Sequence, residues 1–170
     1  KVRGDDFGGH FINGISMADS ESVWKCKLVS ADDEKNVYES ADGYKITAYH
    51  IKKGDVYECY TVFENNGDKT VTLDMISSFA ITDIDADTLH RATSFWSAEG
   101  KMLSQKLTEL NMERSWSGHG IRVEKFGQIG SMPVRKWFPF VAVENSERNK
   151  FIGVQLYIPS SWQIELFRHK

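Results

Sequence analysis

The strongest constraint on the fold is a succession of β-branched and aromatic runs that short polar sequences interrupt. Residues 44–51 and 56–63 are two such runs, and the four residues between them, 52–55, include Gly54. Two runs of this composition around a short loop with a glycine predict a β-hairpin. The chain is therefore expected to build its fold from antiparallel strand pairs.

A second reversal is expected at residues 65–68, where Asn66 and Gly67 stand next to each other. Asn-Gly readily adopts positive φ at both positions, which is the backbone of a type I′ turn. The following segment, 71–81, alternates apolar and polar residues in its first half. We therefore predict a third strand there, which would complete an antiparallel meander.

Strand patterns continue toward the C-terminus. Residues 136–144 and 150–157 flank a polar turn at 145–149, and 162–167 alternates apolar and polar side chains beginning with Trp162. An earlier strand is expected at 23–29. Together these runs predict about ten to twelve strands, and the expected fold class is all-β, a large antiparallel β-sandwich.

One segment, 99–110, permits two interpretations. Leu103, Leu107 and Leu110 lie at helical spacing, which favours an amphipathic helix. An extended chain would instead place Leu103 and Leu107 on one face together with polar residues, a poorer pattern. Periodicity alone favours the helix.

Composition limits the function classes. The chain has 170 residues, 41% apolar and 26% charged, which fits a single globular domain over 1–170. A net charge of −3 leaves no broad basic surface, so a nucleic-acid partner is not expected.

The longest apolar run, 138–143, is too short to span a bilayer, so no membrane association is expected. Cys26 and Cys59 are expected to be buried free thiols in a reducing, cytoplasmic compartment.

Catalytic and metal-binding motifs are sparse in the sequence. The acidic run 83–87 begins like a calcium-binding loop, but Thr88 and Ser94 stand where that loop needs Gly and Glu, so we expect a solvated turn. The five histidines are scattered and none lies near a cysteine, so they are expected to be structural, with no metal site and no cofactor. No nucleophile or phosphate-loop motif is present in the sequence.

Two feature types could bind a ligand. Asp5 and Asp6 lie in a glycine-rich stretch where a carboxylate could contact a ligand, whereas the acidic run 32–34 is expected to be a hydrated turn. Tryptophans could form platforms for sugar rings, although in an all-β domain most of them fill the core. The tryptophans considered are Trp96, Trp116, Trp137 and Trp162.

The order and spacing of several short motifs give a family resemblance over nearly the whole chain. The chain resembles the N-terminal domain of glycoside hydrolase family 36, the α-galactosidases. The motifs are Gly4-Asp5-Asp6, Tyr60-Thr61-Val62-Phe63 before Asn66-Gly67, Ser77-Ser78-Phe79, Leu89 followed by Trp96-Ser97-Ala98-Glu99, the segment 127–131, and Pro139-Phe140.

The resemblance implies a galactose-mutarotase-like β-supersandwich that precedes a catalytic β/α barrel in a larger protein. The barrel, with two aspartates, would hydrolyse terminal α-galactosides with retention, so no catalytic residue is expected in this chain, and the chain alone is expected to be inactive. Implied partners are the barrel of the same protein, its α-galactoside substrate and further copies in a homo-oligomer. By analogy with tetrameric members, the 4–14 loop would border a substrate pocket, with Asp5 and Asp6 binding sugar hydroxyls. The resemblance also implies that 101–108 is extended, and we adopt that prediction over the helix.

Two other function classes remain open from the sequence. One is a stand-alone carbohydrate-binding module that uses tryptophan platforms. The other is a small sugar epimerase of the mutarotase type, which needs a His acid and a Glu base in one groove.

Overall fold

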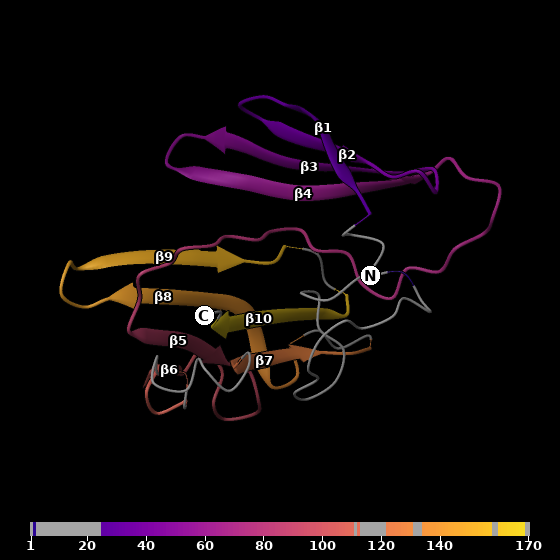
Figure 1. Ribbon diagram of the computed structural model, residues 1–170. Coiled ribbons are helices and arrows are strands. Elements are labelled where there is room, and N and C mark those ends of the chain that lie inside the picture. The colour runs from indigo at the N-terminus through magenta and orange to yellow at the C-terminus, as the bar shows by residue number, and fades with distance from the viewer. Residues whose placement is uncertain are drawn as a thin grey trace. The chain divides into compact units, whose positions relative to one another are not determined.

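The described part of the chain is entirely β-structured in the computed structural model (Figure 1). The structure describes residues 2, 25–110, 112, 122–130, 134–157 and 160–168. These residues form ten strands and no helix, so the all-β class is confirmed. Accordingly, no helix in the described ranges could cross a membrane. The strands are β1 (Lys27–Ala31), β2 (Lys35–Glu39), β3 (Tyr44–Lys53), β4 (Val56–Asn65), β5 (Thr88–Thr93), β6 (Met102–Lys106), β7 (Arg122–Gln128), β8 (Trp137–Asn145), β9 (Lys150–Gln155) and β10 (Trp162–Arg168).

The chain divides into two compact units, an N-terminal unit, Lys1–Thr82, and a C-terminal unit, Asp83–Lys170. The N-terminal unit contains one sheet of order β1-β2-β3-β4. The C-terminal unit contains a sheet of order β6-β5-β8-β9 and the two-stranded sheet β10-β7. All strand pairs are antiparallel, as expected. A single supersandwich over residues 1–170 stays a prediction.

The predicted β3–β4 hairpin is confirmed and is longer than expected. Its register runs from Tyr44 opposite Asn65 to Lys53 opposite Val56, so the connection has two residues instead of four. Gly54, the first of the two, has φ 63°. Positive φ at the first central position is the conformation of a type II′ turn, whose twist matches that of the flanking strands.

The predicted third strand at 71–81 is wrong, and so is the type I′ turn before it. Positive φ is found at neither Asn66 nor Gly67, and the segment forms only an isolated bridge between Leu73 and Val2. The Asn66 N–H instead donates to the Gly43 carbonyl at 2.8 Å. A Cβ at Gly67 would lie 2.6 Å from the Asp42 carbonyl oxygen. Glycine is therefore needed here for close contact between two turns, and the Asn66-Gly67 pair does not form a type I′ turn.

The first strand also begins later than predicted. The sequence predicted a strand at 23–29, whereas β1 covers Lys27–Ala31. Cys26 therefore precedes the strand, and Cys59 lies in β4 as expected. Neither cysteine forms a disulfide, and both are only partly buried. This partial burial raises the pKa of each thiol.

The later hairpin and the final strand agree with the sequence patterns. β8 and β9 pair from Asn145 opposite Lys150 to Phe140 opposite Gln155, around the polar turn predicted there. In the ambiguous segment, Met102–Lys106 is a strand, which confirms the extended prediction. Leu107 and Leu110 belong to the turn that follows and pack at the edge of the core. The helical spacing thus arises from a strand followed by a turn.

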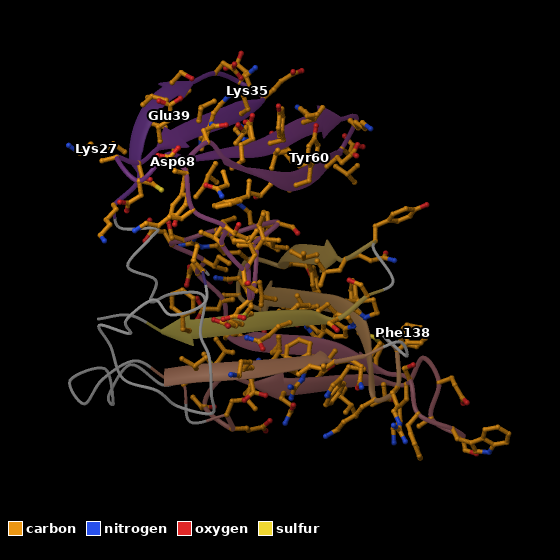
Figure 2. The ribbon with its side chains drawn as sticks, turned by 90° about the vertical axis from the view of Figure 1, so that its right-hand side faces the viewer. Lys27, Lys35, Glu39, Tyr60, Asp68 and Phe138 are labelled. Atoms are coloured by element: carbon orange, nitrogen blue, oxygen red, sulfur yellow. The ribbon has the colours of Figure 1, made fainter. Side chains whose placement is uncertain are left out.

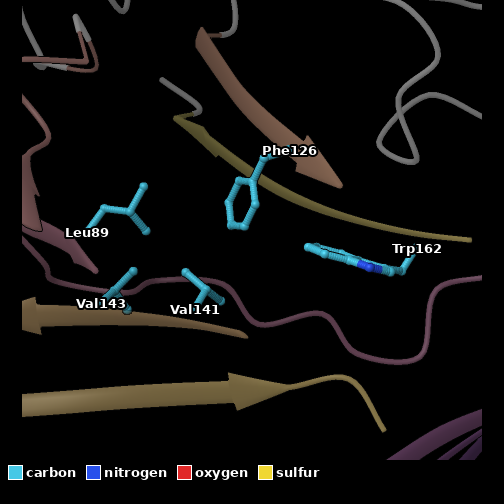
Figure 3. Packing of buried hydrophobic residues seen from close by; sticks show 5 residues of the cluster. All are labelled: Leu89, Phe126, Val141, Val143 and Trp162. Atoms are coloured by element: carbon cyan, nitrogen blue, oxygen red, sulfur yellow. The ribbon is translucent and has the colours of Figure 1, made fainter. Parts of the chain in front are cut away.

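The core of the C-terminal unit lies between its two sheets. It consists of buried side chains from β5, β7, β8 and β10, namely Leu89, Phe126, Val141, Val143 and Trp162 (Figure 3). Figure 3 shows Phe126 extending toward Val141 and Val143 of the facing sheet. The Phe126 and Trp162 rings meet edge to face, with centroids 6.1 Å apart, a favoured aromatic geometry. The predicted alternation of β10 is confirmed, because Ile164 and Leu166 pack against the same cluster as Trp162.

The contact between the two turns makes a stability prediction. Gly43 has φ 84° and a Cβ there would lie 2.6 Å from the Gly67 nitrogen, whereas Gly54 has φ 63° and open space around its Cβ position. Gly54→Ala should cost about 1–2 kcal/mol from backbone strain alone. Gly43→Ala should cost about 1–3 kcal/mol more, because the backbone of the second turn must move. Denaturant unfolding of the chain measures both, and equal losses would contradict the close contact.

Candidate functional site

Only some of the residues that the sequence predicts to contact a ligand lie within the described structure. Asp5, Asp6 and the rest of the 4–14 loop lie outside the described residues, as does Trp116. Of the other tryptophans, Trp162 is in the core and Trp137 is half-buried, whereas Trp96 is 83% exposed. The expectation that most tryptophans fill the core therefore holds for Trp162, and Trp96 remains open to a ligand.

The acidic run 83–87 organises a polar network at one end of the C-terminal unit. Asp87 accepts hydrogen bonds from Lys106 Nζ at 2.7 Å, from the Ser146 backbone N–H at 2.8 Å and from the Thr88 hydroxyl. These bonds, that of Lys106 first, hold the pKa of the Asp87 carboxyl far below its usual range and raise the pKa of Lys106. Asp85 accepts a hydrogen bond from Asn145 at 3.0 Å. These bonds connect the run, which precedes β5, to the β8–β9 turn. The run 83–87 is therefore more structured than the solvated turn that the sequence predicted.

A second group of polar side chains, around His90, lies on the sheet of order β6-β5-β8-β9, on the face that points away from the core. His90 bridges two strands, with Nδ1 2.8 Å from Ser104 Oγ and Nε2 2.8 Å from Glu144 Oε2. The predicted structural role fits the geometry of His90, whereas His10, His119 and His169 lie outside the described residues. In the residues that the structure describes, no group of three potential ligands could hold a metal ion.

The buried Arg91 links the two sheets of the C-terminal unit. Its guanidinium donates to Glu124 at 2.7 Å and to the Gln105 side-chain oxygen. The guanidinium carbon also lies 5.1 Å from the Phe126 ring centroid and 4.7 Å from that of Trp137. Because a buried charge is costly unless it is paired, these groups act as a fixed ionic and cation–π clamp between the layers. The sequence pattern contained no sign of this clamp, since its residues come from four strands.

The candidate interaction site is an apolar patch on the β3–β4 hairpin of the N-terminal unit. Cross-strand pairing places one set of side chains on a common face, and we call this set the tyrosine surface. It consists of Tyr49, Ile51, Val56, Tyr60 and Val62. Figure 2 shows side chains extending from both faces of this sheet, with Tyr60 labelled.

The tyrosine surface has an aromatic centre and a charged border. The Tyr49 and Tyr60 rings stack with centroids 4.5 Å apart and an interplanar angle of 15°. Val56 is 64% exposed, and Tyr60 and Val62 are exposed as well. Ion pairs border the patch, with Lys45 and Glu64 3.2 Å apart and Lys53 in contact with Glu58. An aromatic centre with a charged rim is the usual anatomy of a protein–protein interface.

The opposite face of the same sheet is also apolar. Tyr44 and Phe63 lie there, with ring centroids 5.4 Å apart. Ile46, opposite Phe63, and Tyr38, opposite Ile46, share that face. A sheet with apolar side chains on both faces is typical of an internal layer that needs cover on each side.

Comparisons with known proteins give no relative for this chain. No protein-family model, no curated protein and no solved structure matches it. The family resemblance therefore stays a prediction from the sequence motifs.

The Asp87 network predicts a specific acid sensitivity. Because the folded-state pKa of Asp87 is depressed, its contribution to stability is fully present above its unfolded pKa of about 4 and is lost as the pH falls further. Asp87→Asn should therefore destabilise the chain at pH 7 and reduce the slope of unfolding free energy against pH below about pH 4.

Urea unfolding between pH 2 and pH 7 measures this difference. Asp68→Asn, which removes an exposed carboxylate without a hydrogen-bond partner in the described structure, is the matched control at pH 7. Equal stability of the two variants at pH 7 would contradict the role of Asp87.

Proposed function

We propose that the chain is a noncatalytic β-domain of an α-galactosidase-like glycoside hydrolase, in which it supports a separate catalytic barrel and contacts between subunits. The observation that carries the proposal is the tyrosine surface, an exposed aromatic patch on a sheet whose other face is also apolar. The resemblance in motif order from Gly4-Asp5-Asp6 to Pro139-Phe140 supports the choice of this kind of enzyme.

The physical argument begins with solvent exposure. Val56 and Tyr60 project from a strand held along its whole length by β3, so their exposure is not a consequence of local fraying. Tyrosine supplies a large contact area with little loss of side-chain entropy, and it is enriched in interfaces for that reason. A neighbouring domain of the same protein would cover the tyrosine surface without the entropic cost of a bimolecular association.

In this proposal the reaction takes place on the barrel. Two barrel aspartates would act as nucleophile and acid/base on a terminal α-galactoside, and such chemistry requires no cofactor. The β-domain would contribute position and loops, with Asp5 and Asp6 at the border of a neighbouring subunit's substrate pocket. The cytoplasmic location belongs to the same proposal, as does the homo-oligomer.

The epimerase alternative fits the geometry less well. Among the residues that the structure describes, His90 is hydrogen-bonded through its side chain to that of Glu144, and the two groups are in direct contact at 2.8 Å. An acid and a base that act on one sugar must flank it, so a pair that is hydrogen-bonded to itself leaves no space for the ring between them. Catalysed anomer exchange by the chain would reverse this conclusion.

The tyrosine surface yields the first functional prediction. In the full-length parent enzyme, the double substitution Val56→Lys and Tyr60→Lys should lower the temperature at which α-galactosidase activity is lost, because it buries charges in the domain contact. Thermal inactivation with a chromogenic α-galactoside measures this temperature.

The control is Tyr157→Lys, at a side chain of the C-terminal unit that is 94% exposed. The melting temperature of the 170-residue chain with the same double substitution separates loss of the domain contact from loss of folding. The proposal is wrong if inactivation of the parent is unchanged, or if the 170-residue chain alone cleaves the galactoside.

The second functional prediction concerns the N-terminal loop. In the assembled parent enzyme, Asp6→Ala should raise KM about tenfold or more, the usual effect of losing a hydrogen bond to a charged group, with a smaller change in kcat. Steady-state kinetics on an α-galactoside measures both constants, and Asp33→Ala is the control because Asp33 lies in the exposed turn before β2. Unchanged kinetics would exclude contact between Asp6 and the substrate.

A further inference from the structure

One long edge of the N-terminal sheet has no partner strand among the described residues. In the order β1-β2-β3-β4, β4 is an outer strand, and the strand it pairs with is β3. β4 covers ten residues, and most of its side chains are exposed. The open edge of an outer strand presents unpaired N–H and C=O groups that can pair with another strand. The edge of β4 is therefore a candidate interaction site.

The hydrogen bonds of the neighbouring strand show which β4 residues point outward. In an antiparallel pair, successive residues direct their N–H and C=O groups alternately toward the partner strand and away from it. The His50 N–H donates to the Glu34 carbonyl at 2.7 Å, on the β2 side of β3. Since Cys59 lies opposite His50, its N–H and C=O point away from β3, to the open edge. The β4 residues that point outward by the same alternation are Tyr57, Thr61 and Phe63.

The other outer strands of the two four-stranded sheets have features that discourage pairing, and β4 lacks them. β1 and β6 have five residues each, and β1 contains a register shift. β9 has six residues, with Lys150 at its start and Gly153 inside it. Short length, bulges and lysine are common protection of an edge. β4 keeps an unbroken register with β3 and contains neither lysine nor proline, so it is the edge best suited to strand addition.

The two carboxylates of β4 are held on its paired side. Glu58 contacts Lys53, and Glu64 lies 3.2 Å from Lys45. Both lysines belong to β3, so these ion pairs draw the carboxylates away from the open edge. The lysines also reduce the repulsion that a second strand with glutamates would meet there.

The sequence of β4 is complementary to itself in one antiparallel register. With a two-fold axis at Tyr60, each outward-pointing residue meets an outward-pointing residue of a second copy. Tyr57 then lies opposite Phe63 of the second copy, and Cys59 lies opposite Thr61. Every outward N–H and C=O between residues 57 and 63 obtains a partner in this register, and the aromatic pairs across the strands add to its stability.

Shifting this register by two residues in either direction is less favourable. One shift places Glu58 opposite Glu64 of the second copy, and like charges directly opposite each other are destabilising. The other shift places Phe63 opposite Asp55, which lies in the hairpin turn instead of the strand. In the register centred on Tyr60, each glutamate lies opposite a valine. These valines are Val62, opposite Glu58, and Val56, opposite Glu64.

From these observations we propose that β4 pairs antiparallel with β4 of a second copy of the chain, centred on Tyr60, and joins two N-terminal sheets into one. The contact uses the same edge of both copies, so it closes as a dimer. The inference deepens the proposed function, on whose subunit contacts it rests, by naming the strand that forms one of them. Pairing takes place in the plane of the sheet, so it leaves the tyrosine surface available to a neighbouring domain.

The test measures self-association of the 170-residue chain by sedimentation velocity, under reducing conditions and from micromolar to millimolar concentration. An edge contact of this length is smaller than a standard interface, so we expect a weak dimer whose fraction rises with concentration. Amide hydrogen exchange followed by NMR locates the contact. The outward N–H groups of Tyr57, Cys59, Thr61 and Phe63 should exchange several-fold more slowly at the higher concentration, whereas those of β1 should not change.

Two lysine substitutions test the edge. Tyr57→Lys should raise the dissociation constant of the dimer at least about tenfold, because the dimer contains the pair of Tyr57 with Phe63 twice. Tyr57 is 61% exposed, so this variant should keep the circular dichroism and the unfolding midpoint of the unsubstituted chain. Leu28→Lys is the matched control on β1, at a side chain that is 56% exposed, and it should dimerise like the unsubstituted chain.

A cysteine substitution tests the register. Thr61→Cys should form a disulfide with Cys59 of the second copy under mild oxidation, because directly opposed residues of a hydrogen-bonded pair have Cα atoms about 5.5 Å apart, within the range of a disulfide. Mass spectrometry of the cross-linked peptides identifies the two residues.

Three outcomes would overturn the proposal. The first is a chain that stays monomeric at millimolar concentration. The second is a dimer whose outward β4 N–H groups exchange as fast as in the monomer, which would indicate contact through a face of the sheet. The third is an equal loss of association in Tyr57→Lys and Leu28→Lys. The α-galactosidase proposal is tested on the parent enzyme, so the two proposals can fail separately.

Discussion

The constraint on which the whole structure depends is that every apolar face of a strand needs a covering layer. Side chains of a strand alternate between two faces, so a sheet with apolar residues on both faces cannot be stable against water on either side. In the C-terminal unit the two sheets cover each other through the Leu89 cluster. In the N-terminal unit Tyr44 and Tyr60 lie on opposite faces of one sheet, and its exposed aromatic residues are the direct consequence. In the proposed function, a neighbouring domain covers the exposed apolar face of the N-terminal unit.

The polar groups determine how the layers align. Apolar contacts between sheets are tolerant of small shifts, because many arrangements bury similar areas. The Arg91 guanidinium is satisfied in few relative positions of the two sheets. It must donate to Glu124 and Gln105 while lying against the rings of Phe126 and Trp137. Moving either sheet by one residue would leave a buried charge without its partner, at a cost of several kcal/mol. The clamp therefore contributes more to the specificity of the layer register than to total stability.

The sequence predicted the elements that depend on local chemistry and failed where distant contacts decide. The β3–β4 and β8–β9 hairpins were predictable because strand alternation and turn residues are adjacent in the chain. The third strand was mispredicted because Gly67 packs against the turn at Asp42, a contact that no local pattern reveals. β1 begins four residues later than predicted, and its pairing with β2 includes a register shift between Leu28 and Ser30. Such shifts depend on the partner strand as much as on the strand itself.

The same reasoning explains why the candidate sites were not predictable. The ligand contacts predicted from the sequence are adjacent carboxylates and single tryptophans, which can be recognised without knowing how the strands pair. The backbone hydrogen bond from Ser94 to Lys136 instead requires that β5 pair with β8 so that Thr93 lies opposite Trp137. The tyrosine surface likewise exists only because Tyr49 and Tyr60 are cross-strand partners.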